Sequence, residues 1–202
     1  YPHPVYGVPD DLITVDLGDN QPSIKGQRVR GRLEGKRIVP YYSRAELQQR
    51  NYAGLESKVL AYAADPIDLF FLQIQGSGQI TLPNGKYLRL GYADQNGHPY
   101  KSIGKYLIDK GELTLPQASM QGIKAWAKAN PQRLNELLNA NPSYVFFKVL
   151  NNADGGPLGA LGVPLTDGYS MAIDPKFTPL GAPLFVSTTE PNSAQALNRL
   201  MI

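Results

Sequence analysis

The 202-residue sequence predicts a mainly β protein with a few short helices. Seventeen prolines and 20 glycines are spread along the whole chain, and such frequent breaks favour many short strands over a helical bundle. Apolar residues make up 42% of the chain, which is ordinary for a globular protein. The length is sufficient for one large core or two small ones.

The composition also excludes several kinds of site. The chain has no cysteine, so it can neither form a disulfide nor use a thiol as a nucleophile. The absence of cysteine does not distinguish a cytosolic from a periplasmic protein. The two histidines, His3 and His98, have no second ligand at a suitable spacing, and we therefore expect no metal site. No run of eighteen apolar residues is present, so the sequence predicts no transmembrane helix. The absence of a leader pattern at Tyr1 suggests a mature or trimmed product.

The net charge is only +3, although basic residues gather between Lys25 and Arg37. These residues form either a solvated strand face or a surface that attracts an acidic polymer. A nucleic-acid-binding domain normally carries a stronger basic excess. Twelve tyrosines suit a carbohydrate groove at least as well.

Local patterns predict the elements of the first half of the chain. Residues 1–20 are expected to be extended, and the partial alternation over 27–38 favours a strand. Ser43-Arg-Ala-Glu46 is a capping box, which predicts a short helix from Ser43 to about Arg50.

The next segment is interpreted as a buried strand over 68–75 that ends in Gly76-Ser77-Gly78. Residues 79–82 and 86–92 flank Pro83-Asn84-Gly85, and Asn-Gly between apolar runs predicts a β-hairpin.

Three helices are predicted after the hairpin. Ser102 can cap a helix that continues through Asp109 and stops at Gly111. A second helix is expected over 119–129, where apolar residues share one face: Met120, Ile123, Trp126 and Ala127. Asn130-Pro131 should begin a third, with a buried stripe formed by Leu134, Leu137 and Leu138.

The last quarter of the sequence contains further strand-like segments. Residues 144–150 form one, and the polar, glycine-rich loop at 151–157 is the best candidate for a domain boundary. Short strands are expected over 161–165, 169–173 and 184–186, and the final residues, 197–202, form another. No internal repeat is evident.

Two segments could bind a ligand. Gln75-Gly-Ser-Gly78 places an amide, a hydroxyl and accessible backbone groups in one turn, although a tight turn without function is about as good an interpretation. It lacks the third glycine of a dinucleotide-binding loop and the Lys-Ser/Thr of a phosphate-binding loop. Residues 92–102 combine aromatic, amide and carboxylate groups, as sugar-binding loops do, but an ordinary capped turn fits them too.

Asp174 follows an apolar segment and precedes a proline. It could organise hydrogen bonds, cap a turn, or act as a general acid/base. A glycosidase normally uses two facing carboxylates, and spacing along the chain cannot pair them.

Four segments of the sequence resemble the membrane-bound lytic transglycosylase A (MltA) family. They are residues 66–78, 91–104, 141–147 and 169–183, in the order found in that family. The last is similar to the start of the family's three-aspartate (3D) domain. The resemblance covers essentially the whole chain.

The resemblance implies a particular fold. An inserted small β-barrel domain would occupy 1–145, with short helices near its end. Residues 146–202 would begin a double-psi β-barrel, the 3D domain, and would appear truncated. Glycan would lie in the groove between the two domains.

The resemblance also implies a function, namely peptidoglycan cleavage by a lytic transglycosylase. One carboxylic acid would protonate the oxygen between N-acetylmuramic acid and N-acetylglucosamine and then activate the 6-hydroxyl of the muramic residue. The tethered hydroxyl would form a 1,6-anhydro product without water. Cofactors and metals are not implied, and the acid's pKa must be raised by burial.

The site residues follow from the same resemblance. The catalytic aspartate is expected beyond Ile202, so the chain as written should release no anhydro-muropeptides, and Asp174 should support the site. Substrate-binding residues are expected to be Gln75, Gly76, Ser77, Gly78, Tyr92, Ala93, Lys101 and Ser102.

The implied partners are peptidoglycan glycan strands and other cell-wall enzymes, but not nucleic acid. The family would be periplasmic and anchored in the outer membrane of a Gram-negative bacterium through an N-terminal lipid, with the anchor segment preceding Tyr1. A non-catalytic glycan-binding β module is the alternative function.

Overall fold

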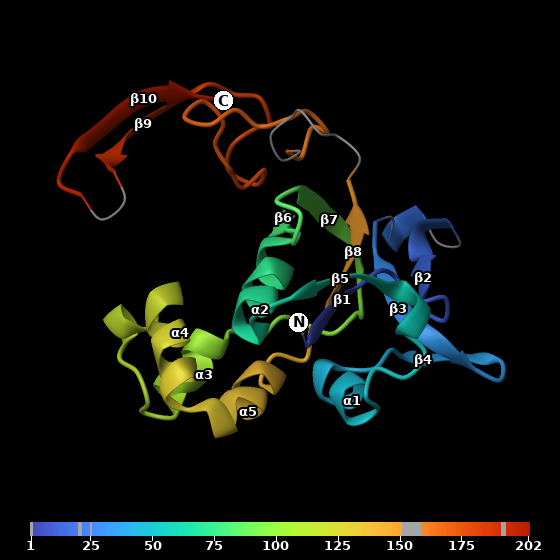
Figure 1. Cartoon of the computed structure of the whole chain (residues 1–202). Coiled ribbons are helices and arrows are strands. Elements are labelled where there is room, and N and C mark those ends of the chain that lie inside the picture. The colour runs from blue at the N-terminus through green and yellow to red at the C-terminus, as the bar shows by residue number, and fades with distance from the viewer. Residues whose placement is uncertain (1, 20–21, 25, 151–158, 191–192) are drawn as a thin grey trace. The chain divides into compact units, whose positions relative to one another are not determined.

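The computed structural model describes residues 2–19, 22–24, 26–150, 159–190 and 193–202, and the chain divides into two units, Tyr1–Leu150 and Asn151–Ile202 (Figure 1). It is mainly β with short helices, as the sequence predicts. No helix in these ranges is long and apolar enough to cross a membrane. The predicted boundary loop at 151–157 lies outside the described residues.

The described part of the first unit contains three antiparallel sheets. One pairs β1 (His3–Tyr6) with β5 (Val59–Ala63). The second has the order β2 (Ile13–Asp16), β3 (Arg28–Glu34) and β4 (Arg37–Pro40). The third has the order β6 (Ser77–Thr81), β7 (Tyr87–Gln95) and β8 (Val145–Val149).

The expected strand over 27–38 is in fact most of a hairpin. Glu34 pairs with Arg37, and Gly35 takes a φ of 59° in the turn, a conformation that glycine adopts without a steric penalty. The hairpin around Asn84-Gly85 is confirmed, with Thr81 paired to Tyr87. A parallel bridge between Gly7 and Phe147 links the segment after β1 to β8.

The described residues contain five α-helices: α1 (Arg44–Gln49), α2 (Pro66–Gln75), α3 (Ile103–Asp109), α4 (Met120–Ala129) and α5 (Leu134–Asn139). The capping box of Ser43 and Glu46 is present, and Ser102 and Ser119 cap α3 and α4. Single 3-10 turns occur at Leu17–Asp19, Pro22–Ile24, Glu56–Lys58, Leu115–Gln117 and Pro131–Arg133.

The prediction of a buried strand over 68–75 is wrong, because this segment forms most of α2. The Asp65 side chain accepts hydrogen bonds from the N–H groups of Ile67 and Asp68, and Pro66 occupies the first turn, where its missing N–H costs nothing. Gly76 ends the helix in the left-handed conformation, with a φ of 76°, and its N–H donates to the Leu72 carbonyl. The cap and stop signals therefore outweigh the apolar run.

Helices α2 to α5 build one core around Phe70, Ile103, Leu107 and Leu137, with Trp126 at its edge. The predicted faces of α4 and α5 are confirmed, except that Met120 is exposed. A second cluster lies between the sheets, where Val5, Leu90 and Phe147 pack together.

In the second unit, β9 (Leu184–Thr189) and β10 (Ala196–Met201) form an antiparallel hairpin. This confirms the last two predicted strands. The strands predicted over 161–165 and 169–173 are wrong: turns and irregular backbone occupy these residues, apart from a single bridge residue at Pro164. Proline and glycine breaks leave segments too short for a ladder, although Ile202 exchanges backbone hydrogen bonds with Tyr169 and Met171.

Candidate functional site

A hollow of about 460 Å³ lies between the C-terminal end of α2 and the segment that follows β7. Two tyrosines in its lining are well exposed, Tyr92 at 43% and Tyr100 at 54%. His98, Gln95 and Gly76 also line it. Exposed aromatic faces beside amide groups can stack on the apolar face of a sugar ring and hydrogen-bond to its hydroxyls.

Gly76 brings the helix end close to β7. A Cβ at this position would lie 3.7 Å from the Cβ of Tyr92, so the bare backbone borders the hollow beside the tyrosine. Of the residues in the Gln75–Gly78 turn, Gly76 therefore borders the same hollow as Tyr92. Burial raises the pKa of Tyr92, so its hydroxyl stays protonated and can donate at neutral pH.

The other members of the turn, Gln75, Ser77 and Gly78, do not line the hollow at Tyr92. Gln75 and Gly78 line a second hollow of about 300 Å³, together with Lys124 of α4. Gln75 is exposed, and Ser77 is half-buried at the start of β6, where it pairs with Gly91. The turn is therefore open to solvent on at least one side within the first unit.

Two buried asparagines fix the segment that carries Tyr100. Asn96 is 1% exposed and donates from Nδ2 to the carbonyls of Tyr42 and Pro142, while its Oδ1 accepts from the Tyr144 N–H. Asn141 accepts from the Lys101 N–H through Oδ1 at 3.1 Å. Buried amides that are hydrogen-bonded to several backbone groups hold a loop in one conformation.

His98 is anchored in the same way, because its Nε2 lies 2.7 Å from the Tyr41 carbonyl oxygen. The loop is therefore pre-organised, which reduces the entropy lost when a ligand binds.

The remaining predicted site residues have structural contacts of their own. Ser102 uses its hydroxyl to cap α3, accepting from the Lys105 N–H at 3.1 Å. Lys101 is exposed, and Ala93 is half-buried within β7. Asp174 lies in the second unit, where its Oδ1 accepts from the Lys176 N–H at 2.9 Å. Its carbonyl accepts from Phe177 and Thr178, so Asp174 begins a turn.

The predicted substrate-binding set omitted Tyr100 and His98. The signal for both was present, since they lie in the aromatic and amide-rich segment over 92–102. The asparagine contacts that fix the loop join residues about 46 positions apart, and no local pattern contains them. The described residues include no group of three His, Cys, Asp or Glu that could hold a metal ion.

The MltA specific insert domain matches residues 1–148 of the chain. Over 153 residues the chain is 43% identical to membrane-bound lytic murein transglycosylase A of Escherichia coli K12, covering 73% of this chain and 41% of that protein. The protein of the same name from Vibrio cholerae is 38% identical over 144 residues, covering 70% and 38%.

Comparison with solved structures points to the same family as the sequence matches. MltA from Neisseria gonorrhoeae in its monoclinic form is 48% identical with a TM-score of 0.80, covering 98% of this chain and 56% of that one. E. coli MltA with bound chitohexaose is 31% identical with a TM-score of 0.73, covering 100% and 53%. The chain spans about two fifths of these curated relatives and just over half of these solved chains. By its matched domain and its fold, it belongs to the MltA family.

Proposed function

We propose that this chain is part of a peptidoglycan lytic transglycosylase and that its first unit supplies a surface for glycan strands. The hollow bordered by Gly76, Tyr92 and Tyr100 carries this proposal, because it combines exposed aromatic faces with the side-chain amide of Gln95. The names of the relatives support the reaction, and the chitohexaose bound to E. coli MltA supports the ligand class.

The proposed reaction is the non-hydrolytic cleavage of the bond between N-acetylmuramic acid and N-acetylglucosamine. A carboxylic acid donates a proton to the departing oxygen and then takes the proton of the muramic 6-hydroxyl, which attacks its own anomeric carbon. We assign the proton donor to no residue of 1–202. Asp174 is proposed as a positioning residue, in keeping with the turn that its carboxylate and carbonyl organise.

Two measurements test the proposal. The 202-residue chain should bind chitohexaose in a calorimetric titration. The protein purified from its native source should release 1,6-anhydro-muropeptides from purified sacculi, as detected by mass spectrometry. Hydrolytic products with free reducing ends would contradict the reaction. Binding without any product from the native protein would favour the alternative, a non-catalytic glycan-binding module.

The relatives are named membrane-bound proteins. We propose that the protein works in the periplasm, held to the outer membrane by a lipid anchor, where it can meet other cell-wall enzymes. Fractionation of cells that express the native gene tests this, since recovery in the cytoplasmic fraction would contradict it.

A further inference from the structure

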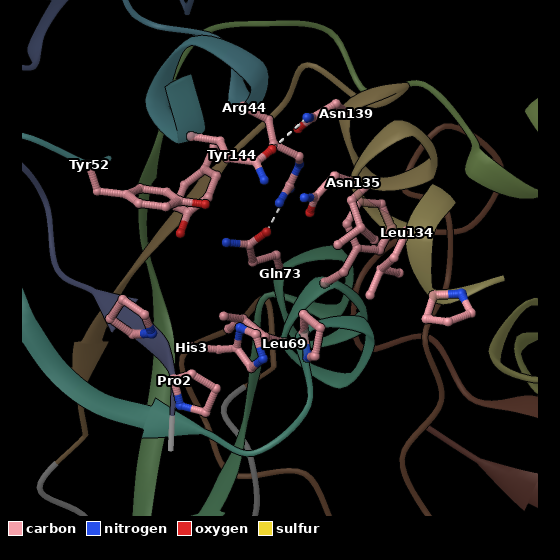
Figure 2. A pocket seen from close by; sticks show the side chains of 16 residues that line it. Pro2, His3, Arg44, Tyr52, Leu69, Gln73, Leu134, Asn135, Asn139 and Tyr144 are labelled. Atoms are coloured by element: carbon pink, nitrogen blue, oxygen red, sulfur yellow. Dashed lines mark hydrogen bonds between the residues drawn. The ribbon is translucent and has the colours of Figure 1, made fainter. Parts of the chain in front are cut away.

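Another cavity, of about 450 Å³, lies in the first unit among β1, α1, α2 and α5. Its lining includes Arg44, Gln73, Asn135 and Tyr144, and Figure 2 shows these side chains around it together with Leu69 and Leu134. Binding sites for small molecules enclose roughly 300–1,000 Å³ and combine apolar walls with a few polar groups. This cavity has both properties.

Arg44 is the unusual member of the lining, because it is a buried cation. It is only 7% exposed, and no acidic side chain of the described residues forms an ion pair with it. Burial lowers its pKa to about 10, so the guanidinium remains charged at neutral pH. A buried charge without a counter-ion is costly and calls for an explanation.

Neutral groups satisfy part of the guanidinium. Nε donates to the Asn141 carbonyl at 3.1 Å, and Nη2 donates to Gln73 Oε1 at 2.6 Å and to the Ser143 carbonyl at 2.7 Å. The rings of Phe70 and Tyr144 lie 4.7 and 4.9 Å from its central carbon. Nη1 donates to no described residue. The guanidinium is therefore held rigidly in the cavity lining. Among the described residues, its Nη1 has no acceptor and its charge has no counter-ion.

Asn135 supplies a second unused group. It is exposed on α5, and its side chain makes no hydrogen bond to a described residue. By contrast, Asn139 on the same helix donates to Gln48 at 2.6 Å. A carboxylate accepts charge-assisted hydrogen bonds from guanidinium and amide donors through its two oxygens. The apolar lining, with Leu69 and Leu134, suits a small aliphatic side chain next to that carboxylate.

We propose that this cavity binds the free carboxylate of a short peptide, with Arg44 as its counter-ion and Asn135 as a further donor. The source of the peptide rests on the proposed function: in peptidoglycan, the carboxylates are those of the peptide stems, which contain D-amino acids. The cavity shares Gln73 of α2 with the hollow at Tyr92 but is otherwise lined by different residues, so a chain could engage glycan at one and a stem carboxylate at the other.

The experiment is a calorimetric titration of the 202-residue chain with N-acetyl-D-alanyl-D-alanine, its C-terminal amide, and the L,L isomer. The acid should bind at least about tenfold more tightly than the amide, because charge-assisted bonds are roughly twice as strong as neutral ones. Binding of the acid should weaken as salt is added. The D,D isomer should bind more tightly than the L,L isomer.

Asn135→Asp tests the site without touching the buried cation. It keeps the shape of the side chain, removes a donor and adds a repelling charge, so the affinity for the acid should fall by about tenfold or more. Gln132→Glu is the matched control, since it adds the same charge at an exposed position outside the lining and should bind like the wild type. Thermal denaturation of both variants verifies the fold.

Equal affinity for acid and amide, or an Asn135→Asp variant that binds like the wild type, would overturn the site and leave Arg44 with a structural role alone. Preference for the L,L isomer would overturn the peptidoglycan stem as the source. These results are separable from the proposed function: a chain that binds chitohexaose but not the dipeptide contradicts only this inference, and the reverse contradicts only the glycan surface.

Discussion

Arg30 on β3 forms an ion pair with Asp94 on β7, and this pair joins the β2-β3-β4 sheet to the β6-β7-β8 sheet. Both side chains are largely buried, at 16% and 19% exposed. Thr14 of β2 also donates to Asp94, at 2.8 Å. The contact fixes β7 immediately before the loop that carries His98 and Tyr100, so it links the packing of the sheets to the geometry of the candidate site.

Replacing Asp94 by Asn should lower the free energy of unfolding by about 1–2 kcal/mol at neutral pH, because it removes the charge that Arg30 meets in a partly buried contact. Chemical denaturation measures this change. Asp16→Asn is the matched control, since the Arg28–Asp16 pair is longer, at 3.4 Å, and more exposed. That variant should lose at most a few tenths of a kcal/mol. Equal losses would contradict a special role for Asp94.

The same pair predicts a pH dependence. Burial alone would raise the pKa of Asp94, but hydrogen bonds from Arg30, the Gln95 N–H and Thr14 outweigh it and hold the pKa below its ordinary value. The carboxylate therefore stabilises the folded state above the pKa of the unfolded chain, and this contribution is lost as the pH falls through the folded value. The stability difference between wild type and Asp94→Asn should be constant at neutral pH and shrink below about pH 4. A difference that grows on acidification would contradict this.

Tyr92→Ala should weaken chitohexaose binding by roughly 0.5–1.5 kcal/mol, through loss of a stacking face and a hydroxyl, and leave the fold intact. Tyr87→Ala is the control, because Tyr87 lies on the same strand and is 66% exposed but does not line the hollow. Ser77→Ala tests the neighbouring turn and should produce a loss in the same range. Unchanged affinity in the Tyr92 variant, measured by titration, would contradict its assignment to glycan binding.

Local chemistry predicted much of this fold. The caps at Ser43, Ser102 and Ser119 and the Asn84-Gly85 turn each depend on residues close in sequence, and each is present. The strand predicted over 68–75 failed because the apolar run concealed a helical face, in which Ile67, Phe70 and Gln73 are buried every third residue.

The candidate site was predicted only in part. Gly76 and Tyr92, both among the expected substrate-binding residues, border the same hollow, and Tyr100 lies in the segment over 92–102, for which a sugar-binding loop was one of two interpretations. No local sequence pattern predicts the cavity lined by Arg44. Arg44 is the first residue of an ordinary capped helix, where a charged side chain is normally interpreted as exposed to solvent. Its partners, Gln73 and the carbonyls of Asn141 and Ser143, are between 29 and 99 positions away.

Gly76→Ala tests whether α2 ends as a helix with a left-handed cap. An alanine at a φ of 76° is strained by about 1 kcal/mol, so the free energy of unfolding should fall by that amount. Gly111→Ala is the matched control after α3: its φ is 71° and a new Cβ would meet nothing within 4 Å, so it should show the same loss from backbone strain alone. A neutral Gly76→Ala variant would contradict the cap.

Ser102→Ala separates the two roles considered for this residue. As the cap of α3, its hydroxyl should contribute about 1 kcal/mol to stability, and Ser102→Asp should keep most of it, because aspartate also accepts from the third N–H of a helix. If Ser102 also binds substrate, the aspartate variant should fold normally yet bind chitohexaose differently from wild type. A stable Ser102→Asp variant with unchanged affinity would restrict Ser102 to capping, and a stable Ser102→Ala variant would contradict the cap. Urea denaturation and calorimetric titration on the same preparations give both answers, because one reports the helix and the other the surface beside Tyr100.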